Sequence, residues 1–473
     1  MGTIAPQVIL RLGSHAEKEY FEKLAPQLDA VMFGSNLLEI TPTATASFLA
    51  LLREKRNSKG VVPYYLDPIT YCFGAYIDPE TGRKRIDLEA LKSERTDRKT
   101  KKKFVAVKDS YSTLAKQLGP KFEAAVNDGR ACAAIDPALI LPNERDLFCR
   151  GVLDYQEKRI ASIISSEIPK DDAVMLEAFA GIGSPAALFA PYFFIHETWA
   201  DEGFETAIDL ISRSVAQKTQ TPIHGMICAS HAILRQSAYV DFLIAEIPKT
   251  RANGIWLWFD GFDECEVRLD ELIAFRRLVK SLASSMKVFN LHGGFFSLLL
   301  GHDGMTGISH GVGYGEKKPV AQVIGAAAPT VRYYLPPIRK RAGVPDIQRC
   351  FPDVPVKSSA DFFKEVCDCT ICKGVIGNDV RRFAAYGEMH RANATAQRDT
   401  QTSKAAKICR FHFLLNRMKE RGLVASLARD QRAKYVIDCA SRWRTLFPMR
   451  QHLGEPGLDG YIEKWAKALD SAL

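Results

Sequence analysis

The sequence lacks any uninterrupted apolar run of about 18 residues, which is the length that a membrane-spanning helix needs. It also lacks a basic N-terminal segment followed by an apolar core, and no Ser or Thr follows Gly2 at the spacing of a myristoylation signal. Internal repeats and low-complexity tracts are absent too. These absences predict a soluble, cytoplasmic protein that does not bind membranes.

The composition is that of an ordinary globular chain. Its 473 residues are 47% hydrophobic, which is enough to bury a large core. This length fits two or three domains, or one barrel of roughly 250 residues with additions. The 11 cysteines are an odd number, and most stand alone in apolar surroundings. In a reducing compartment such cysteines behave as small buried hydrophobic residues, so only a tight cluster of them needs a separate explanation.

The chain has a formal net charge of +9, which permits nucleic-acid binding without requiring it. The densest basic run, RTDRKTKKK, covers residues 95–103. One interpretation of this run is a solvated loop. The other is an arm that contacts phosphates, whose affinity would fall steeply with salt.

Short apolar runs alternate with segments of helical periodicity through much of the chain. Several runs are almost continuously apolar, which is typical of parallel strands covered on both faces. About eight strands with intervening helices predict an α/β protein with a (β/α)8 TIM-like barrel, and a doubly wound sheet is the alternative. The predicted strands cover residues 31–36, 61–67, 173–179, 192–197, 223–229, 255–260, 288–294 and 307–315. Polar or glycine-rich groups follow nearly every one of them, at the strand ends that build the active site of a barrel.

A cysteine cluster stands out in the C-terminal third. VCDCTICKG places Cys367, Cys369 and Cys372 within six residues, and a short loop lets three thiolates converge on one metal ion. This pattern predicts one structural zinc ion per chain. An iron–sulfur cluster is the alternative, and it would use a further cysteine.

The fourth metal ligand is expected from the helical stretch that follows. This stretch offers His412 first and Cys409 second, which lie one turn apart on the same face, and His390 is a more distant candidate. A site closed by four protein ligands leaves no position for a water molecule, so we expect it to be structural and not catalytic.

These patterns divide the chain into four parts. Residues 1–77 are expected to begin the barrel, and residues 78–150 form a charged insertion. Residues 151–330 complete the barrel, and residues 331–473 form a zinc-binding helical extension.

The Cys-x-Cys-x-x-Cys motif, followed by a histidine on a helix after a glycine-rich parallel barrel, resembles the tRNA-guanine transglycosylases. The resemblance covers roughly residues 30–75 and 170–420. That superfamily exchanges guanine for a 7-deazaguanine base of the queuosine or archaeosine pathway, and one of its branches modifies DNA. The resemblance implies a pentosyltransferase whose partners are a nucleic acid and a free 7-deazaguanine-type base. It also implies a homodimer through the zinc region.

The family has an aspartate followed four residues later by an aromatic ring, and here Asp67 and Tyr71 match that spacing. A carboxylate accepts hydrogen bonds from a purine edge, and a ring stacks on its face. The alternative is an Asp-Pro turn beside a core tyrosine. At the family's aspartate–glutamate pair this chain has His196 and Glu197, and Cys228 stands where the family has glutamine. The glycine–leucine segment, whose backbone contacts the base, matches Gly261 and Phe262.

This chain departs from the family at the nucleophile. The family's nucleophilic aspartate ends the last barrel strand, where this sequence has Ser309 and His310. Asp67, Asp260 and His310 are therefore the catalytic candidates. Other carboxylates that could serve are Asp263 and Asp303.

Base exchange passes through an oxocarbenium-like state that a carboxylate can capture at C1′. An imidazole such as His196 or His310 could protonate the leaving purine. A base in a duplex must first be flipped out, and Tyr71 is the ring expected to stack on it.

Three functions remain open on the sequence. The first is base exchange in a nucleic acid, with DNA slightly favoured over tRNA because of the altered base pocket and the insertion. The second is a catalytically inactive subunit that binds nucleic acid or a partner transglycosylase. The third is a metal-dependent barrel hydrolase whose catalytic ion is held by His196, Glu197, His224, Asp260 and His292.

Overall fold

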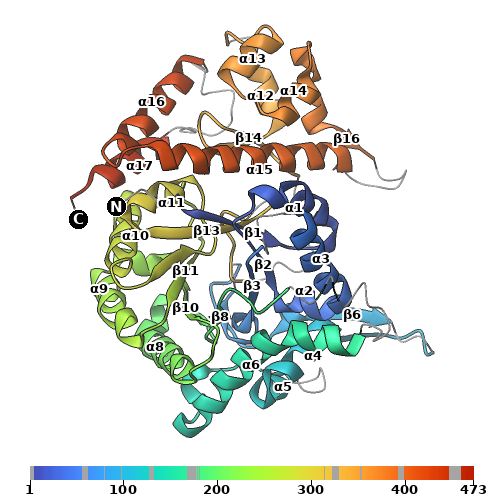
Figure 1. Ribbon diagram of the computed structural model, residues 1–473, viewed down its shortest axis with the longest axis vertical. Coiled ribbons are helices and arrows are strands. Elements are labelled where there is room, and N and C mark those ends of the chain that lie inside the picture. The colour runs from blue at the N-terminus through green and yellow to red at the C-terminus, as the bar shows by residue number, and fades with distance from the viewer. Residues whose placement is uncertain are drawn as a thin grey trace.

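The computed structural model describes most of the 473 residues (Figure 1). The described residues are 5–55, 62–78, 80–96, 99–126, 133–167, 177, 179, 182–313, 315–321, 330–351, 354–391, 399–446 and 460–472. No helix within these ranges is both long and apolar enough to cross a membrane.

The centre of the protein is a nearly closed parallel barrel with eight strand positions (Figure 1). Successive strands pair along most of the ring, the short strands β8 and β9 both pair with β10, and the last strand, β13, pairs with the first, β1. Where the ring nearly closes, between β3 and β8, the Ala186 N–H donates a hydrogen bond to the carbonyl of Tyr64 (2.8 Å). The strands are β1 (Gln7–Leu12), β2 (Ala30–Gly34), β3 (Tyr64–Asp67), β8 (Leu188–Phe189), β9 (Phe194–Ile195), β10 (Ile223–Ser230), β11 (Gly254–Asp260), β12 (Lys287–Asn290) and β13 (Met305–Gly311). This order has no point at which it reverses, so a doubly wound sheet does not describe it.

The strands are buried on both faces, as their apolar sequences indicate. In β10 and β2 every residue is buried, and in β11 only the last residue, Asp260, is partly exposed. Helices cover the outside of the ring because parallel strands need crossover connections. These helices are α1 (Lys18–Leu24), α2 (Ser35–Ile40), α3 (Pro42–Lys55), α8 (Ala200–Ala216), α9 (Ser237–Glu246), α10 (Leu269–Leu282) and α11 (Phe295–Leu299).

The strand predictions differ from the structure in several places. The first barrel strand, β1, was not predicted, because its six residues contain Arg11 within an otherwise apolar run. The strand predicted at 173–179 lies mostly outside the described residues, and the two that are described, Glu177 and Phe179, are helical. The strand predicted at 307–315 ends earlier, at Gly311.

In the described residues between β3 and β8 the chain forms two hairpins and several helices. The hairpins pair β4 (Tyr76–Ile77) with β5 (Lys84–Arg85) and β6 (Lys92–Thr96) with β7 (Lys103–Val107). The described residues of the basic run, 95–96 and 99–103, lie in the second hairpin. The helices are α4 (Asp109–Leu118), α5 (Pro120–Ala125) and α6 (Pro142–Glu167), and α6 runs across the boundary expected at residue 150.

The C-terminal extension is mainly helical and shares one continuous hydrophobic core with the barrel. Its longest helix, α15 (Ser403–Ser426), runs between the barrel and the smaller helices α12 (Val344–Cys350), α13 (Ser359–Glu365) and α14 (Thr370–Ile376) (Figure 1). The remaining elements are the antiparallel pairs β14 (Tyr333–Leu335) with β15 (Lys340–Ala342) and β16 (Met389–His390) with β17 (Thr400–Gln401), and helices α16 (Gln431–Leu446) and α17 (Gly460–Asp470).

Candidate functional site

The C-terminal ends of the barrel strands meet at one end of the ring, here called the barrel mouth. Asp67 ends β3 and is completely buried. Its carboxylate accepts hydrogen bonds from Arg11 of β1 (2.6 Å) and from the hydroxyl of Tyr192 (2.7 Å). Arg11 lies two strand positions away across β2 and compensates the buried negative charge. The mouth thus holds a fixed carboxylate whose surroundings already supply a cation and a hydroxyl.

A tight turn after Asp67 brings an aromatic ring over the mouth. The carboxylate also accepts a hydrogen bond from the N–H of Ile69 (2.9 Å), and Ile69 has left-handed backbone geometry (φ 48°). This turn leads into the short 3-10 helix Thr70–Phe73, which carries Tyr71. The Asp-Pro turn, which was the alternative interpretation of Asp67, is therefore present. The same carboxylate also forms the ion pair with Arg11.

Tyr71 sits in an aromatic group at the mouth. Its ring stacks on Tyr192 at a centroid distance of 5.6 Å and meets Trp258 edge-on at 4.7 Å. Lys318 donates a hydrogen bond from Nζ to the Tyr71 hydroxyl (3.0 Å). The same Nζ lies 5.6 Å from the ring centre of Tyr71 and 5.7 Å from that of Trp258, within cation–π range.

Lys318 belongs to a segment, residues 315–321, that follows β13 and folds back over the mouth. We call this segment the strap. His292 donates from Nδ1 to the carbonyl of Gly315 (3.1 Å), and Trp258 donates from Nε1 to the carbonyl of Lys318 (3.1 Å). Further along, the N–H of Val320 donates to the Asp260 carboxylate (2.7 Å). Side chains from and after β11 and β12 therefore fix the backbone of the strap on both sides of Lys318.

The buried polar atoms at the mouth that have no hydrogen-bond partner among the described residues include Nε2 of His292 and Oγ of Ser309. Burial, followed by the charges of Arg11 and Lys318, holds the pKa of His292 well below its usual value, so the imidazole is neutral. Because Nδ1 carries the proton that binds Gly315, Nε2 presents a free lone pair. Buried polar groups without partners are rare in proteins, and these two mark a place where a ligand can bind.

Burial also changes the titration of two nucleophilic side chains here. Burial and, after it, the charge of Arg11 lower the pKa of Lys318 to about 8. In Cys228 of β10 burial raises the pKa of the thiol, and the negative charges of Asp260 and Asp67 add to that effect. The thiol is therefore protonated at neutral pH, whereas about a tenth of Lys318 is the neutral amine at pH 7.

A second polar group lies at the ends of β9, β10 and β11. His196 Nε2 is 3.2 Å from the Glu197 carboxylate, and the carbonyl of Asp260 accepts a hydrogen bond from His231 Nδ1 (2.8 Å). Burial raises the pKa of Asp260 above its usual value. For Glu197 the cost of burial is outweighed by a hydrogen bond from Ser230, and the pKa is lowered. The group therefore contains one carboxyl with a raised pKa, Asp260, and one with a lowered pKa, Glu197.

Gly261 and Phe262 continue the chain beyond β11. Gly261 has a left-handed backbone (φ 72°), and a Cβ there would lie 3.2 Å from His231 Nδ1. The Phe262 ring is buried on the outside of the barrel, where it packs against Phe275 of α10 at 5.0 Å. The phenylalanine side chain is therefore part of the outer core, and only the backbone of this segment borders the mouth.

His310 faces away from the inside of the barrel. In the pairing of β1 with β13, Arg11 lies opposite Gly311, and side chains alternate along a strand, so His310 points to the other face. Its ring packs against Phe413 of α15 at 5.2 Å. Ser309 has the inward orientation that was expected of a catalytic group at this strand end.

The other carboxylates considered for catalysis are used differently. Asp263 pairs with Lys317 on the protein surface (2.6 Å). Asp303 precedes β13 and therefore lies at the end of the barrel opposite the mouth. There it binds three arginines: Arg276 (3.0 Å), Arg429 (3.0 Å) and Arg432 (2.9 Å). Its role is to join the barrel to the extension.

The metal site of a barrel hydrolase is not assembled. His224 lies at the start of β10, opposite the mouth, and accepts a hydrogen bond from Trp256 Nε1 (3.0 Å). Burial lowers the pKa of this histidine to about 3. The prediction that His224 joins His196, Asp260 and His292 around an ion is therefore wrong. In the described part of the chain one group has the geometry of a metal site, and it lies in the extension.

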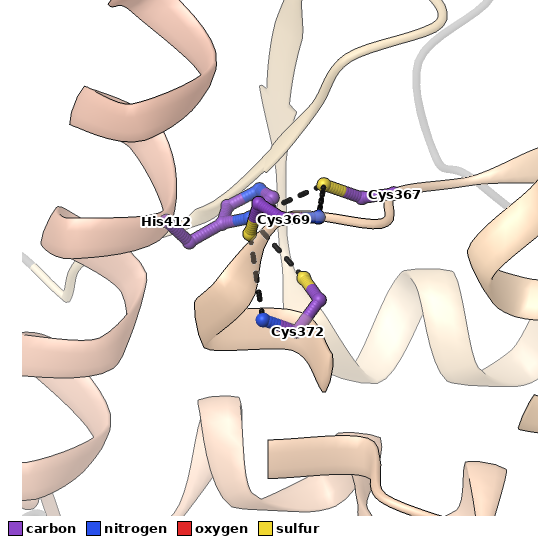
Figure 2. Close-up of side chains that lie close together, drawn as sticks. All are labelled: Cys367, Cys369, Cys372 and His412. Atoms are coloured by element: carbon purple, nitrogen blue, oxygen red, sulfur yellow. Dashed lines mark hydrogen bonds between the residues drawn. The ribbon is translucent and has the colours of Figure 1, made fainter. Parts of the chain in front are cut away.

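That group consists of Cys367, Cys369, Cys372 and His412, all buried (Figure 2). Their ligand atoms lie within 4.8 Å of one another. His412 Nδ1 is 3.8, 3.4 and 3.3 Å from the three sulfurs in chain order. Tetrahedral zinc with bonds of about 2.3 Å to sulfur and about 2.0 Å to nitrogen places these atoms roughly 3.5 Å apart. The donor set and its spacing therefore fit a zinc-sized tetrahedral ion.

The surroundings orient the ligands of this cluster. His412 Nε2 donates to the carbonyl of Tyr334 (2.7 Å), which leaves the Nδ1 lone pair directed at the sulfurs. The hydroxyl of Tyr386 donates to the Cys372 sulfur (3.1 Å), and the hydroxyl of Tyr333 lies 3.2 Å from the same sulfur. Of the two other ligand candidates, Cys409 bonds the carbonyl of Tyr386 and His390 lies in an exposed strand. His412 is therefore the fourth member.

Sequence reasoning missed Arg11, Tyr192, Trp258 and Lys318 at the mouth. A signal existed for Arg11, because a lone arginine within an apolar strand needs a buried partner. Lys318 had no comparable signal, since it follows the predicted strand in a polar segment and reaches the mouth only because the strap folds back.

Comparison with known proteins adds no assignment. No protein-family model matches the chain, and a search of curated proteins finds no match either. The chemistry of the site must therefore be inferred from its own residues.

Proposed function

We propose that the protein is a nucleobase transglycosylase that exchanges guanine for a 7-deazaguanine-type base in a nucleic acid. The observation that carries this proposal is the meeting of Asp67 with an aromatic group at the mouth of a parallel barrel. A purine bound there has a carboxylate for its N–H edge and rings for its faces. The Cys3His cluster in the extension supports the same proposal, because it matches the motif on which the family resemblance rests.

The side chains at the mouth have distinct tasks in this reaction. Arg11 and Tyr192 hold the Asp67 carboxylate in place, so it need not reorganise when a base binds. Tyr71 and Trp258 supply stacking surface for a base that has left its helix. His196 and Glu197 lie at the neighbouring strand ends, where they can contact the sugar or the base edge.

We assign Zn²⁺ to the Cys3His cluster as a structural ion. All four positions of a tetrahedral ion are filled by Cys367, Cys369, Cys372 and His412, which leaves none for substrate. When bound, the ion ties α14 and the loop before it to α15. It supplies folding energy and takes no part in the exchange.

DNA is the favoured polymer, and the β6–β7 hairpin is the favoured contact with its backbone. The hairpin carries Lys99, Lys101, Lys102 and Lys103, and the last of these is 70% exposed while paired with Glu94. Exposed lysines at a hairpin tip neutralise phosphates without reading sequence.

The test measures incorporation of radiolabelled guanine into bulk tRNA and, separately, into double-stranded DNA. Label is expected in DNA, and Asp67→Ala is expected to abolish it. The matched control is Asp438→Ala, which removes an exposed carboxylate of α16 that pairs with Lys434. Exchange that persists in Asp67→Ala contradicts the assignment of the site.

A second candidate function is a non-catalytic subunit that binds nucleic acid or a partner transglycosylase. It is favoured by the residues near the end of β13, which are Ser309 and His310. The last strand therefore contributes no carboxylate to the mouth. This candidate predicts no label in either polymer, together with nucleic-acid binding that weakens as salt is added.

A further inference from the structure

The exchange reaction needs a group that captures C1′ when guanine leaves, and the last strand offers no carboxylate for this purpose. Lys318 is a nucleophilic side chain that the fold brings to the mouth. It follows β13 by seven residues, and the strap returns its side chain to the mouth, where Nζ lies 3.0 Å from the Tyr71 hydroxyl. The amine therefore sits beside the ring expected to stack on the flipped base.

Three further observations distinguish Lys318 from a solvated lysine. Its backbone carbonyl is held by Trp258 Nε1, and the neighbouring Val320 is held by Asp260. Its Nζ lies between two aromatic rings. Arg11 is close enough to act on it electrostatically, and this positive charge favours the neutral amine. No described carboxylate forms a salt bridge with it, whereas its neighbour Lys317 pairs with Asp263 on the surface.

His292 supplies the matching proton acceptor. It is 5% exposed, its ring lies 5.1 Å from that of Trp258, and its Nε2 lone pair has no partner among the described residues. Lys318 and His292 both lie against Trp258, whose ring centre is 5.7 Å from Lys318 Nζ and 5.1 Å from the imidazole.

We propose that Lys318 is the nucleophile of the base exchange and forms a covalent bond to C1′ of the nucleotide, with His292 carrying the proton. This inference rests on the proposed transglycosylase function. It replaces the carboxylate that the family resemblance implies by an amine, the kind of nucleophile that a desolvated lysine near a second cation provides.

The step balances without an oxidant or reductant. The neutral amine forms the Nζ–C1′ bond while the bond from C1′ to N9 of guanine breaks, and the electron pair leaves with the base. His292 Nε2 accepts one proton from the new Nζ–C1′ amine and delivers it to the departing guanine. The adduct opens reversibly at C1′–O4′, with the remaining Nζ proton moving to O4′, to give an imine. After the ring closes again, N9 of the incoming base attacks C1′, Nζ leaves, and His292 returns a proton from the incoming base to the amine.

The imine makes the proposal testable on the unmodified chain. The protein is incubated with guanine-containing double-stranded DNA, or with bulk tRNA, in the presence of sodium cyanoborohydride. This reagent reduces the imine to a stable amine that joins protein and polymer. We expect a covalent complex, and digestion followed by mass spectrometry is expected to place the added sugar on Lys318.

Matched variants accompany the trapping. Lys318→Arg keeps a cation but removes the nucleophile, and a loss of guanine exchange of about 1,000-fold or more is expected. Lys317→Arg makes the same change one residue earlier on the surface and is expected to leave exchange unchanged. Thermal unfolding of both variants establishes that each is folded. The wild-type trapping result stands even if Lys318→Arg does not fold.

The outcomes distinguish a failure of the Lys318 assignment from a failure of the proposed transglycosylase function. If the wild type exchanges guanine but Lys318→Arg retains activity within tenfold, or if the trapped sugar is on another residue or absent, Lys318 is not the nucleophile and the transglycosylase function stands. If the wild type exchanges guanine into neither polymer, the proposed function fails, and the role of Lys318 fails with it.

Discussion

Arg11 and Asp67 form a salt bridge of 2.6 Å at the barrel mouth, although they come from strands β1 and β3 with β2 between them. The Asp67 side chain is fully buried and that of Arg11 is 13% exposed. Removing one member of such a pair leaves the other as an uncompensated buried charge. The pair is therefore both a feature of the candidate site and a determinant of stability.

We predict that Asp67→Asn lowers the free energy of unfolding by about 3–5 kcal/mol, because the Arg11 charge loses its partner. The double variant Arg11→Met/Asp67→Asn should be less destabilised than the sum of the two single variants, by about 2 kcal/mol. Urea unfolding of the wild type and the three variants measures this coupling. Additivity within about 0.5 kcal/mol would show that the two side chains do not interact.

We predict one zinc ion per chain. Cys372→Ser should remove it and should destabilise the protein by roughly 4 kcal/mol or more, since the ion joins α14 to α15. Metal analysis of the purified protein and chemical unfolding are the measurements. Cys409→Ser is the control, because this cysteine is buried one turn before His412 but lies outside the cluster. If Cys409→Ser loses zinc and Cys372→Ser keeps it, then Cys409 binds the ion and Cys372 does not.

The exchange rate should depend on the protonation of Lys318 if this residue is the nucleophile. The groups around it are Arg11, Asp67, Cys72, Cys228 and His292, and the net result is a pKa of about 8. Because only the neutral amine attacks, the single-turnover rate should rise about tenfold per pH unit below pH 8 and become constant above it. A rate that falls as pH rises through this range would be inconsistent with an amine nucleophile.

Asp303 should make stability sensitive to acid. Burial alone would raise the pKa of this carboxyl, but the hydrogen bond from Arg276 and the charge of Arg432 outweigh it and lower the pKa. A lowered pKa means that the carboxylate contributes stability above its unfolded pKa of about 3.9, and that this contribution is lost as pH falls through the folded value. Unfolding of the wild type and of Asp303→Asn between pH 6 and pH 3 measures it.

The Asp303→Asn variant should be less stable than the wild type by about 3–5 kcal/mol at neutral pH, because three arginines lose their shared anion. The difference should shrink toward pH 3. A difference that stays constant over this range would mean that the charge of Asp303 is not what stabilises the junction.

The β6–β7 hairpin should contribute to nucleic-acid affinity. Replacing Lys99, Lys101 and Lys102 by Gln is predicted to weaken binding to double-stranded DNA about tenfold at 0.15 M salt. It should also reduce the slope of log K against log[salt] by about 2–3, since each phosphate contact contributes about 0.9. Fluorescence anisotropy over a series of salt concentrations measures both quantities.

The control for this prediction removes the same charge elsewhere. The control lysines lie at the C-terminal ends of helical segments that cover the outside of the barrel, at the end opposite the mouth. They are Lys218, Lys249 and Lys280. Their triple replacement by Gln should leave the slope nearly unchanged. An equal loss in both triple variants would mean that net charge, and not the hairpin, drives binding.

Much of the architecture could be predicted from local patterns. Runs such as residues 223–229 and 255–260 are almost continuously apolar, which is typical of strands buried on both faces. The Cys367–Cys372 motif was equally informative, because three thiolates in one short loop have few other uses. β1 was missed because Arg11 interrupts its apolar run, although that residue later proves to be a core element of the mouth.

The candidate site was predicted less well. Local patterns do not show which way a strand side chain points or at which end of the barrel it lies. His310 and Ser309 are adjacent, yet the pleat turns one toward α15 and the other toward the inside of the barrel. The sequence could not tell which of the two faces inward without the register of β13 against β1. His224 and Asp260 looked equivalent as polar residues on strands, but they lie at opposite ends of the barrel.

The amino-acid sequence by itself determined the class of the fold, the three cysteines of the cluster and the presence of Asp67 and Tyr71 at one strand end, because each depends on residues close together in the chain. The fold was needed to place His412, and not Cys409, beside those cysteines. Tertiary structure alone decided that Arg11 would neutralise Asp67 and that Lys318 would return to Tyr71. The two residues of the first contact are 56 positions apart in the chain, and those of the second are 247 positions apart. The closing of the ring and the folding of the strap bring them together, and neither has a local signature in the chain.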